Sequence, residues 1–214
     1  MLLCPSTMCL DLLNLKEEIR TLEDAGTDIF HNDIMDGCFV PNFALGLSDF
    51  RAIRACTDRP CDVHLMIENP GEKVDWFIDS GVDIIYIHPE SERYVVRTLQ
   101  HIRDRGVKAG IVINPDTSIE TVKEMLNVCD YVMVMTVNPG FAGQKYIDFC
   151  TKKVEELGKM KEEYGFKLMI DGGCSPEKIE LLKSKGADGF ILGTSSLFGK
   201  GRPYKDIMEE LRSL

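Results

Sequence analysis

Short apolar runs alternate with amphipathic segments along the whole chain. The short runs are typical of buried strands, and apolar side chains spaced like Leu15, Ile19 and Leu22 are typical of helices. We predict strands over residues 2–5, 28–34, 61–66, 83–87, 108–113, 131–135, 167–170 and 188–192. We predict helices over residues 14–25, 47–55, 70–80, 92–105, 119–127, 147–163, 176–185 and 204–211.

A repeated glycine and aspartate pattern separates predicted helices from the strands that follow them. It occurs in the segments 25–28, 80–83 and 185–188. Glycine is favoured just after a helix because it readily adopts left-handed backbone conformations. Eight strand–helix units indicate a single-domain (β/α)8 barrel of the α/β class, the TIM-barrel fold, over residues 1–214. A doubly wound open sheet is the alternative for the same alternation.

The composition narrows the class of protein. Hydrophobic residues make up 44% of the 214 residues, which is normal for a soluble globular protein. No apolar run approaches the ~18–20 residues of a membrane span, and the N-terminus lacks the features of a signal peptide. The eight cysteines contain no Cys-x-x-Cys pair, which favours free thiols in a reducing compartment. We therefore expect a cytoplasmic protein that does not bind membranes, and the net charge of −10 argues against nucleic-acid binding.

Three predicted strands end in side chains that can bind metals. His31 and Asp33 lie two residues apart on one face of the second strand, His64 near the end of the third, and Asp171 after the seventh. In a parallel barrel these strand ends converge on one mouth, so the four residues would form a cluster. Two imidazoles and two carboxylates suit a divalent cation. For each residue alone, a core histidine or a loop aspartate is the plain alternative.

Glycine-rich loops follow three adjacent predicted strands. They contain residues 138–144 after the sixth strand, Gly172 and Gly173 after the seventh, and Gly193 and Thr194 after the eighth. Glycine lets backbone amides approach an anion closely. The loops after strands seven and eight are the usual phosphate site of this fold. We therefore expect a phosphate held by backbone amides, with ordinary tight turns as the alternative.

The two aspartates at strand ends indicate a proton-transfer reaction. Asp33 and Asp171 lie three strands apart around the predicted ring and would face each other across the mouth. This placement suits removal of a proton from one face of a carbon and its return on the other. The α-proton of a ketose is poorly acidic, so a metal must stabilise the developing enediolate. The joint presence of both aspartates argues against a catalytically silent sugar-phosphate sensor.

Other candidate residues near the mouth have several possible roles. We expect Met8, Met35, Met66 and Met135 to line the mouth, and Met133 and Met169 to fill the barrel. His88 follows the fourth strand, where it could touch substrate, support the site from behind or anchor its loop. We expect Asp36 to form a turn. No lysine lies at the catalytic end of a predicted strand, which disfavours the rival of the same fold, a phosphate-binding decarboxylase or Schiff-base aldolase.

From Pro5 to Gly199 the sequence resembles the ribulose-phosphate 3-epimerase family of metal-dependent barrels. The matching blocks are Pro5-Ser6, His31-Asn32-Asp33-Ile34-Met35-Asp36-Gly37, Phe39-Val40-Pro41-Asn42, Asp62-Val63-His64-Leu65-Met66, Asn138-Pro139-Gly140-Phe141-Ala142-Gly143-Gln144 and Asp171-Gly172-Gly173. The resemblance implies metal ligands at His31, Asp33, His64 and Asp171, with both aspartates as acid and base. It implies substrate contacts at Ser6, His64 and Asp171, and phosphate contacts at Gly140, Phe141, Ala142, Gly143, Gly172, Gly173, Gly193 and Thr194.

Within that family several blocks look more like the D-allulose-6-phosphate 3-epimerase branch. This likeness rests on Met8, Cys9, His88, Pro89, Thr136, Cys174 and Thr194. It implies interconversion of D-allulose 6-phosphate and D-fructose 6-phosphate, with D-ribulose 5-phosphate and D-xylulose 5-phosphate as the alternative pair. Asn138 and Gly173 instead look like the pentulose enzymes. Asn32 and Cys38 depart from the family pattern, which has an apolar residue and a histidine at these positions.

The expected cofactor and partners follow from the same residues and resemblance. One divalent cation is expected, and the ligand set suits zinc, manganese, cobalt, iron or magnesium. The expected partner is a small-molecule sugar phosphate. Family members commonly oligomerise, so the resemblance also implies a homo-oligomer.

Overall fold

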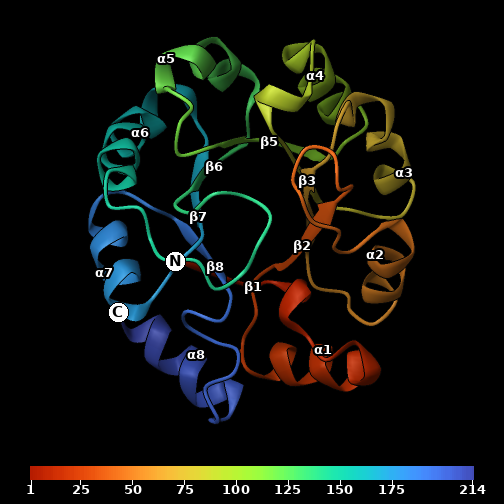
Figure 1. Ribbon diagram of the computed structural model, residues 1–214, viewed down its shortest axis with the longest axis vertical. Helices are drawn as coiled ribbons and strands as arrows, with labels where there is room; N and C mark the ends of the chain where they lie inside the picture. Colours follow the sequence, from red (N-terminus) through yellow and green to blue (C-terminus); the bar gives the residue numbers. More distant parts are fainter.

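Eight parallel strands form a ring at the centre of the computed structural model, which describes residues 1–214 (Figure 1). The strands are β1 (Leu2–Pro5), β2 (Phe30–Met35), β3 (Cys61–Met66), β4 (Ile84–Ile87), β5 (Lys108–Ile113), β6 (Tyr131–Met135), β7 (Lys167–Asp171) and β8 (Gly189–Leu192). From β2 to β8 each strand pairs with the next in sequence, and β8 pairs with β1. A parallel bridge between Ser6 and His31 joins β1 to β2. The predicted barrel is therefore confirmed, and the open-sheet alternative is wrong.

The helices surround the strands and follow one another around the ring in chain order (Figure 1). The α-helices are α1 (Leu15–Asp24), α2 (Leu47–Arg54), α3 (Val74–Ile78), α4 (Val95–Asp104), α5 (Ile119–Val122), α6 (Cys150–Tyr164), α7 (Pro176–Ser184) and α8 (Tyr204–Ser213). Short 3₁₀ segments are η1 (Thr7–Cys9), η2 (Leu12–Asn14), η3 (Pro70–Glu72), η4 (Pro89–Ser91) and η5 (Lys123–Val128). None of these helices combines the length and apolar character needed to cross a membrane.

Several predicted helices differ from the observed ones. The fourth starts at Val95 rather than at residue 92, and three others differ for local reasons. The predicted helix over residues 70–80 is split into η3 and α3, because Lys73 between them leaves the helical region with φ −124°. The predicted helix over 119–127 is α5 followed by the tighter η5. The sixth helix starts at Cys150 rather than at residue 147, because the backbone N–H of Ile147 donates to the carbonyl of Thr136 and holds this segment against β6.

Two apolar layers enclose the strands. The larger lies between the barrel and the helices and contains Phe30, Phe50 and Phe190, all fully buried. The smaller fills the barrel interior with side chains that include Tyr86, Met133 and Met169. Met133 and Met169 are therefore barrel-filling residues, as the sequence predicts. This interior layer closes the barrel below the mouth, so a ligand can enter only from the end where the strands terminate.

Four aspartates, three of them from the repeated glycine pattern, tie neighbouring strands together at the opposite end of the barrel. Asp28, Asp83, Asp130 and Asp188 precede the even-numbered strands, and each accepts a backbone N–H from the preceding odd-numbered strand. The donors, in the same order, are Leu3 at 2.8 Å, Cys61 at 2.8 Å, Ala109 at 3.0 Å and Leu168 at 2.7 Å. Each aspartate is also paired with a basic side chain; the bases are Arg212, Arg54, Lys108 and Lys161. The pattern therefore fixes strand register below the site.

Removal of one such carboxylate should destabilise the barrel. In Asp188→Ala the N–H of the buried Leu168 loses its acceptor, so the free energy of unfolding should fall by ~1–3 kcal/mol. Asp188→Asn keeps an acceptor oxygen and should lose less. Asp79→Ala removes only an exposed ion pair with Arg105 and should cost ~1 kcal/mol or less. Urea unfolding measures all three, and equal losses for Asp188→Ala and Asp79→Ala would contradict this role.

Candidate active site

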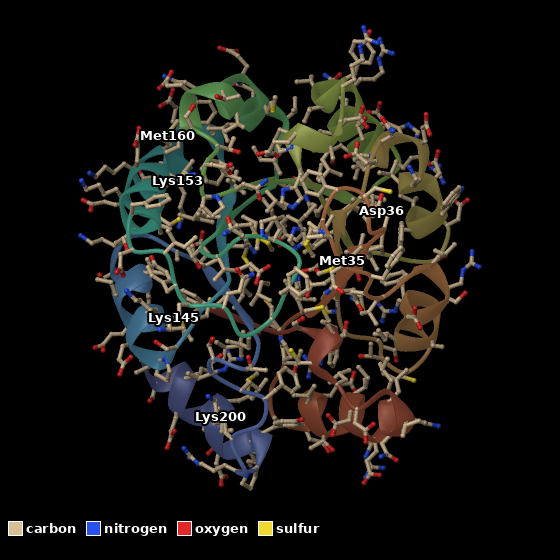
Figure 2. The ribbon with its side chains drawn as sticks, viewed as in Figure 1. Met35, Asp36, Lys145, Lys153, Met160 and Lys200 are labelled. Atoms are coloured by element: carbon tan, nitrogen blue, oxygen red, sulfur yellow. The ribbon has the colours of Figure 1, made fainter.

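A cavity opens at the carboxyl ends of the strands, where the sequence predicts the site. Its polar floor carries Asp33 and Asp171, and its walls come from the loops after β1, β6, β7 and β8. The lining residues are Ser6, Met8, Cys9, Asp33, Met35, Met66, Met135, Val137, Asn138, Gly140, Phe141, Ala142, Gly143, Gln144, Asp171, Gly172, Gly173, Cys174, Ile191, Gly193, Thr194 and Ser195. Figure 2 shows Met35 near the centre of the ring, with Lys145, Lys153 and Lys200 away from it. The residues that line the cavity include no lysine or arginine.

The strand register brings the four predicted ligands together. His31 lies beside Asp62 and Asp33 lies beside His64 in the β2–β3 pairing. Asp171 ends β7 and reaches the cluster from three strands away. One ligand atom from each of His31, Asp33, His64 and Asp171 lies within 4.8 Å of the others. The two histidines are fully buried and the two aspartates are largely buried, so the predicted cluster exists as one compact site.

The spacing of the ligand atoms fits a bound cation. Nε2 of His31 and Nδ1 of His64 each lie 3.2 Å from Oδ1 of Asp33. Oδ2 of Asp171 lies 3.6 Å from Nδ1 of His64 and 4.0 Å from Nε2 of His31. A tetrahedral ion with bonds of ~2.0–2.1 Å holds its ligand atoms ~3.3 Å apart. These four side chains could therefore hold one divalent cation after only small adjustments.

The charges in the cluster shift the pKa values of its members. Burial alone would lower the pKa of His31, but the charges of Asp62 and Asp33 raise it well above its ordinary value. Burial also opposes the charged form of His64, and hydrogen bonds with Asp171 and Asp33 nevertheless raise its pKa. Burial opposes ionisation of Asp33, but His31 and His64 hold its pKa well below the ordinary value. Without a cation, the neighbouring carboxylates therefore favour the protonated form of both imidazoles.

Each ligand histidine uses its second ring nitrogen to contact another buried side chain. Nδ1 of His31 lies 2.8 Å from Oδ1 of Asp62, and Nε2 of His64 lies 2.8 Å from Nε2 of His88. Burial and the neighbouring His64 lower the pKa of His88 well below its ordinary value, so His88 is neutral. Such contacts fix the orientation and tautomer of histidines that bind metals. His88 therefore lies behind the site and does not line the cavity.

Asn32 has a structural role that the sequence does not reveal. Its side-chain amide donates to the backbone carbonyl of Asp62 at 2.7 Å and to that of Phe30 at 3.0 Å. Its side-chain oxygen accepts from the hydroxyl of Thr7 at 2.8 Å. Asn32 therefore joins η1, β2 and β3 behind His31. Asp62 is a further residue of the site, because it contacts His31. Asp62 and His64 are two residues apart on β3 and so lie on the same face of the strand. This spacing is the feature of the sequence that indicates a place for Asp62 beside the cluster.

The three glycine-rich loops meet on one side of the cavity, as the sequence predicts. The backbone N–H groups of Gly143, Gly173, Gly193 and Ser195 donate to no acceptor in the protein. Gly143 and Gly173 have φ values of 79° and 61°, in the left-handed region that disfavours other residues. Unused amides around a polar hollow suit an anion, even though no basic side chain lines the cavity. The loops could therefore hold a phosphate.

The loop between β6 and α6 passes in front of the barrel centre in Figure 1. Asn42, from the loop between β2 and α2, donates to the carbonyl of Gly140 in this segment at 2.7 Å. A Cβ on Gly140 would come within 3.2 Å of Val40, so the absence of a side chain permits this close approach. Gln144 donates to the carbonyls of Asn138 and Phe141 within the same loop. These contacts hold the cover of the cavity in a defined shape.

The remaining candidates have clear positions. The four methionines expected at the mouth, Met8, Met35, Met66 and Met135, all line the cavity. Asp36 forms the predicted turn, because its carboxylate accepts the N–H groups of Cys38, Phe39 and Glu68. Cys38 is exposed and lies outside the cavity lining. All of the predicted substrate-contact residues except His64, which lies beneath the floor, line the cavity.

Comparisons with a family model and with individual known proteins indicate the same family. The model described as Ribulose-phosphate 3 epimerase family matches residues 2–198. A ribulose-phosphate 3-epimerase of Bacillus subtilis (strain 168) is 40% identical over 208 residues, covering 96% of this chain and 95% of that protein. A ribulose-phosphate 3-epimerase of Escherichia coli (strain K12) is 36% identical over 215 residues, covering 99% of this chain and 95% of that protein.

A solved structure has the same barrel architecture. A crystal structure of 3-hexulose-6-phosphate synthase gives a TM-score of 0.71 at 16% identity, covering 100% of this chain and 99% of that chain. At this identity the likeness shows the fold alone. A divalent cation at the cluster of His31, Asp33, His64 and Asp171 agrees with the metal dependence of the matched family. The chain therefore belongs to the ribulose-phosphate 3-epimerase family, and it is an isomerase.

Proposed function

We propose that this protein is a metal-dependent epimerase acting at C3 of D-ribulose 5-phosphate and D-xylulose 5-phosphate. The observation that carries the proposal is the cluster of two carboxylates on the floor of a cavity and two imidazoles buried beneath it. The relatives described above are ribulose-phosphate 3-epimerases, which supports a ketose phosphate as the substrate. His31, Asp33, His64 and Asp171 are the proposed cation ligands.

The proposed reaction uses the two aspartates as acid and base. The bound cation would stabilise negative charge that develops on the substrate oxygens when C3 loses its proton. Asp33 and Asp171 lie on strands separated by β1 and β8. In this proposal they would approach the substrate from opposite sides. One aspartate removes the C3 proton and the other delivers a proton to the opposite face. The Ser6 hydroxyl donates to Oδ2 of Asp33 at 2.6 Å and orients this carboxylate.

The substrate phosphate would bind away from the reacting carbon. The free N–H groups of Gly143, Gly173, Gly193 and Ser195 surround that part of the cavity. In this proposal they hold the phosphate together with the other predicted loop residues, which are Gly140, Phe141, Ala142, Gly172 and Thr194. A chain with a net charge of −10 needs such local donors, because its overall field repels an anion. Met35, Met66 and Met135 would line the carbon chain.

The pentulose pair has better support than the hexulose pair that the branch likeness implies. Of the residues behind that likeness, Met8, Cys9, Cys174 and Thr194 line the cavity. His88 and Thr136 are fully buried outside it. The Thr136 hydroxyl donates to the backbone carbonyl of Asp171 at 3.1 Å, which is a structural role. The relatives quoted above are described as ribulose-phosphate enzymes rather than allulose-phosphate enzymes.

A substrate panel tests the choice between the two pairs. The value of kcat/KM should be higher for D-ribulose 5-phosphate than for D-allulose 6-phosphate, with a ratio of ~10–200-fold at most, because one carbon unit is worth only ~1–3 kcal/mol. Free D-ribulose should react far less efficiently because phosphate binding lowers the barrier. In deuterated water the product should gain one deuteron at C3. Label at C1, or a ratio that favours the hexulose, would refute the corresponding assignment.

Replacement of one aspartate tests the acid–base assignment. Asp171→Asn keeps the size of the side chain but cannot exchange the proton, so kcat should fall by at least ~10²-fold. The metal content of the variant must be measured, because the same carboxylate is a proposed ligand. Asp148→Asn changes an exposed carboxylate paired with Lys178 and serves as the matched control, with no expected change. Wild-type kcat in metal-loaded Asp171→Asn would overturn the assignment.

Cation binding should release protons. The pKa values of His31 and His64 are raised, so both imidazoles hold protons more tightly than a free imidazole when no cation is bound. A cation needs their lone pairs, so its apparent affinity should rise with pH as these protons become easier to remove. Calorimetry of zinc binding in buffers with different ionisation enthalpies measures the protons released. An affinity independent of pH, with no protons released, would contradict the proposed ligand set.

A further inference from the structure

The two ring nitrogens of His64 face different environments. Nδ1 points into the cluster, 3.2 Å from Asp33 and 3.6 Å from Asp171. Nε2 points away from it, 2.8 Å from Nε2 of His88. The two rings are fully buried and lie with their centroids 5.0 Å apart, at an interplanar angle of 26°. No other partner is available to Nε2 of His64, so the protonation of this nitrogen depends on His88.

Two imidazole nitrogens at hydrogen-bond distance must share one proton. With no proton between them the lone pairs repel, and with two protons the N–H groups collide. If Nδ1 of His64 is to offer a lone pair to a cation, the ring proton must be on Nε2. Nε2 of His88 is then the acceptor, and the remaining proton of His88 is on its Nδ1. That Nδ1 faces Oε2 of Glu90 at 3.8 Å, which favours a proton at this position.

The surroundings of His88 hold its ring in place. The side chain of Phe39 packs on it with the ring centroids 4.8 Å apart. The carbonyl of His88 accepts both the backbone N–H and the hydroxyl of Ser91, at 3.1 and 3.0 Å. Burial and Phe39 therefore restrict the ring of His88, and Ser91 fixes the backbone that carries it.

We propose that His88 is a positioning residue, which accepts the Nε2–H of His64 and thereby keeps the Nδ1 lone pair directed at the cation. This inference rests on the proposed cation site at His31, Asp33, His64 and Asp171. His31 is supported differently, because its second nitrogen faces the carboxylate of Asp62. The site thus combines one imidazole supported by a carboxylate with one supported by a neutral acceptor. A neutral partner orients His64 without adding another negative charge next to the cation.

Two substitutions of His88 distinguish the effect of losing the acceptor atom from the effect of losing the volume of the ring. His88→Phe keeps an aromatic ring against Phe39 but leaves the Nε2–H of His64 buried without an acceptor. His88→Gln offers an amide oxygen in its place. The affinity for zinc should fall ~10–100-fold in His88→Phe, as is typical when such a supporting partner is lost. His88→Gln should stay closer to the wild type than to His88→Phe.

Imidazole nitrogen NMR of the zinc-bound wild type gives a direct readout. The ring proton of His64 should be on Nε2, with Nδ1 bound to the cation. His101→Phe is the matched control, because His101 lies on α4 and pairs with Asp75 away from the cavity. This variant should bind zinc like the wild type. Thermal unfolding of the metal-free proteins shows which variants fold, and the NMR result on the wild type does not depend on any variant.

The outcomes separate this inference from the proposed function. If the wild type binds no divalent cation at the four-residue cluster, the proposed function fails. If the wild type binds zinc there but folded His88→Phe binds it equally tightly, the role of His88 is refuted. A proton on Nδ1 of His64 in the zinc-bound wild type also refutes it. Weak binding by His88→Phe, together with recovery in His88→Gln, supports it.

Discussion

The placement of two carboxylates and two imidazoles within 4.8 Å of one another is the constraint on which the rest of the site depends. The carboxylate of Asp33 raises the pKa of both imidazoles, and the imidazoles lower the pKa of Asp33. A divalent cation bound among the four side chains would supply positive charge in place of the imidazole protons. The same four residues thus account for the shifted pKa values and for a site that suits a metal ion.

The barrel keeps these buried polar side chains apart from its apolar core. Its interior below the mouth is filled by apolar side chains such as Tyr86 and Met169, so the polar cluster is confined to one end. At the other end, aspartates such as Asp28 and Asp188 bond to neighbouring strands and fix their register. Register matters because a shift of one residue would turn His31 and Asp33 away from the mouth. The contacts that fix the strand register at one end of the barrel therefore keep the polar side chains of the site in place at the other end.

Much of the fold and site follows from local sequence patterns. Short apolar runs predict every strand, and the fold brings their ends together, which is why His31, Asp33, His64 and Asp171 could be grouped in advance. The short helices after β3 and β5 could not be predicted, because their breaks depend on local backbone geometry at residues such as Lys73. The contact between His64 and His88 also escaped prediction, since it depends on the relative height of two neighbouring strands.

The substrate preference depends on fewer residues than the sequence suggests. A position can differ between enzyme branches without touching the ligand, as the buried Thr136 shows. Cys38 departs from the family pattern but lies outside the cavity lining. Only the residues that line the cavity can distinguish sugars by contact, and these include four methionines and five glycines. In the proposed reaction such a surface would recognise a phosphate and a reacting carbon more strictly than the length of the chain between them.

The most direct test of the central claim is a crystal structure of the zinc-loaded protein with anomalous diffraction at the zinc edge. We expect one zinc ion per chain, ~2.0–2.2 Å from Nε2 of His31, Nδ1 of His64 and one carboxylate oxygen each of Asp33 and Asp171. A zinc ion at another location, or one bound without either aspartate, would contradict it.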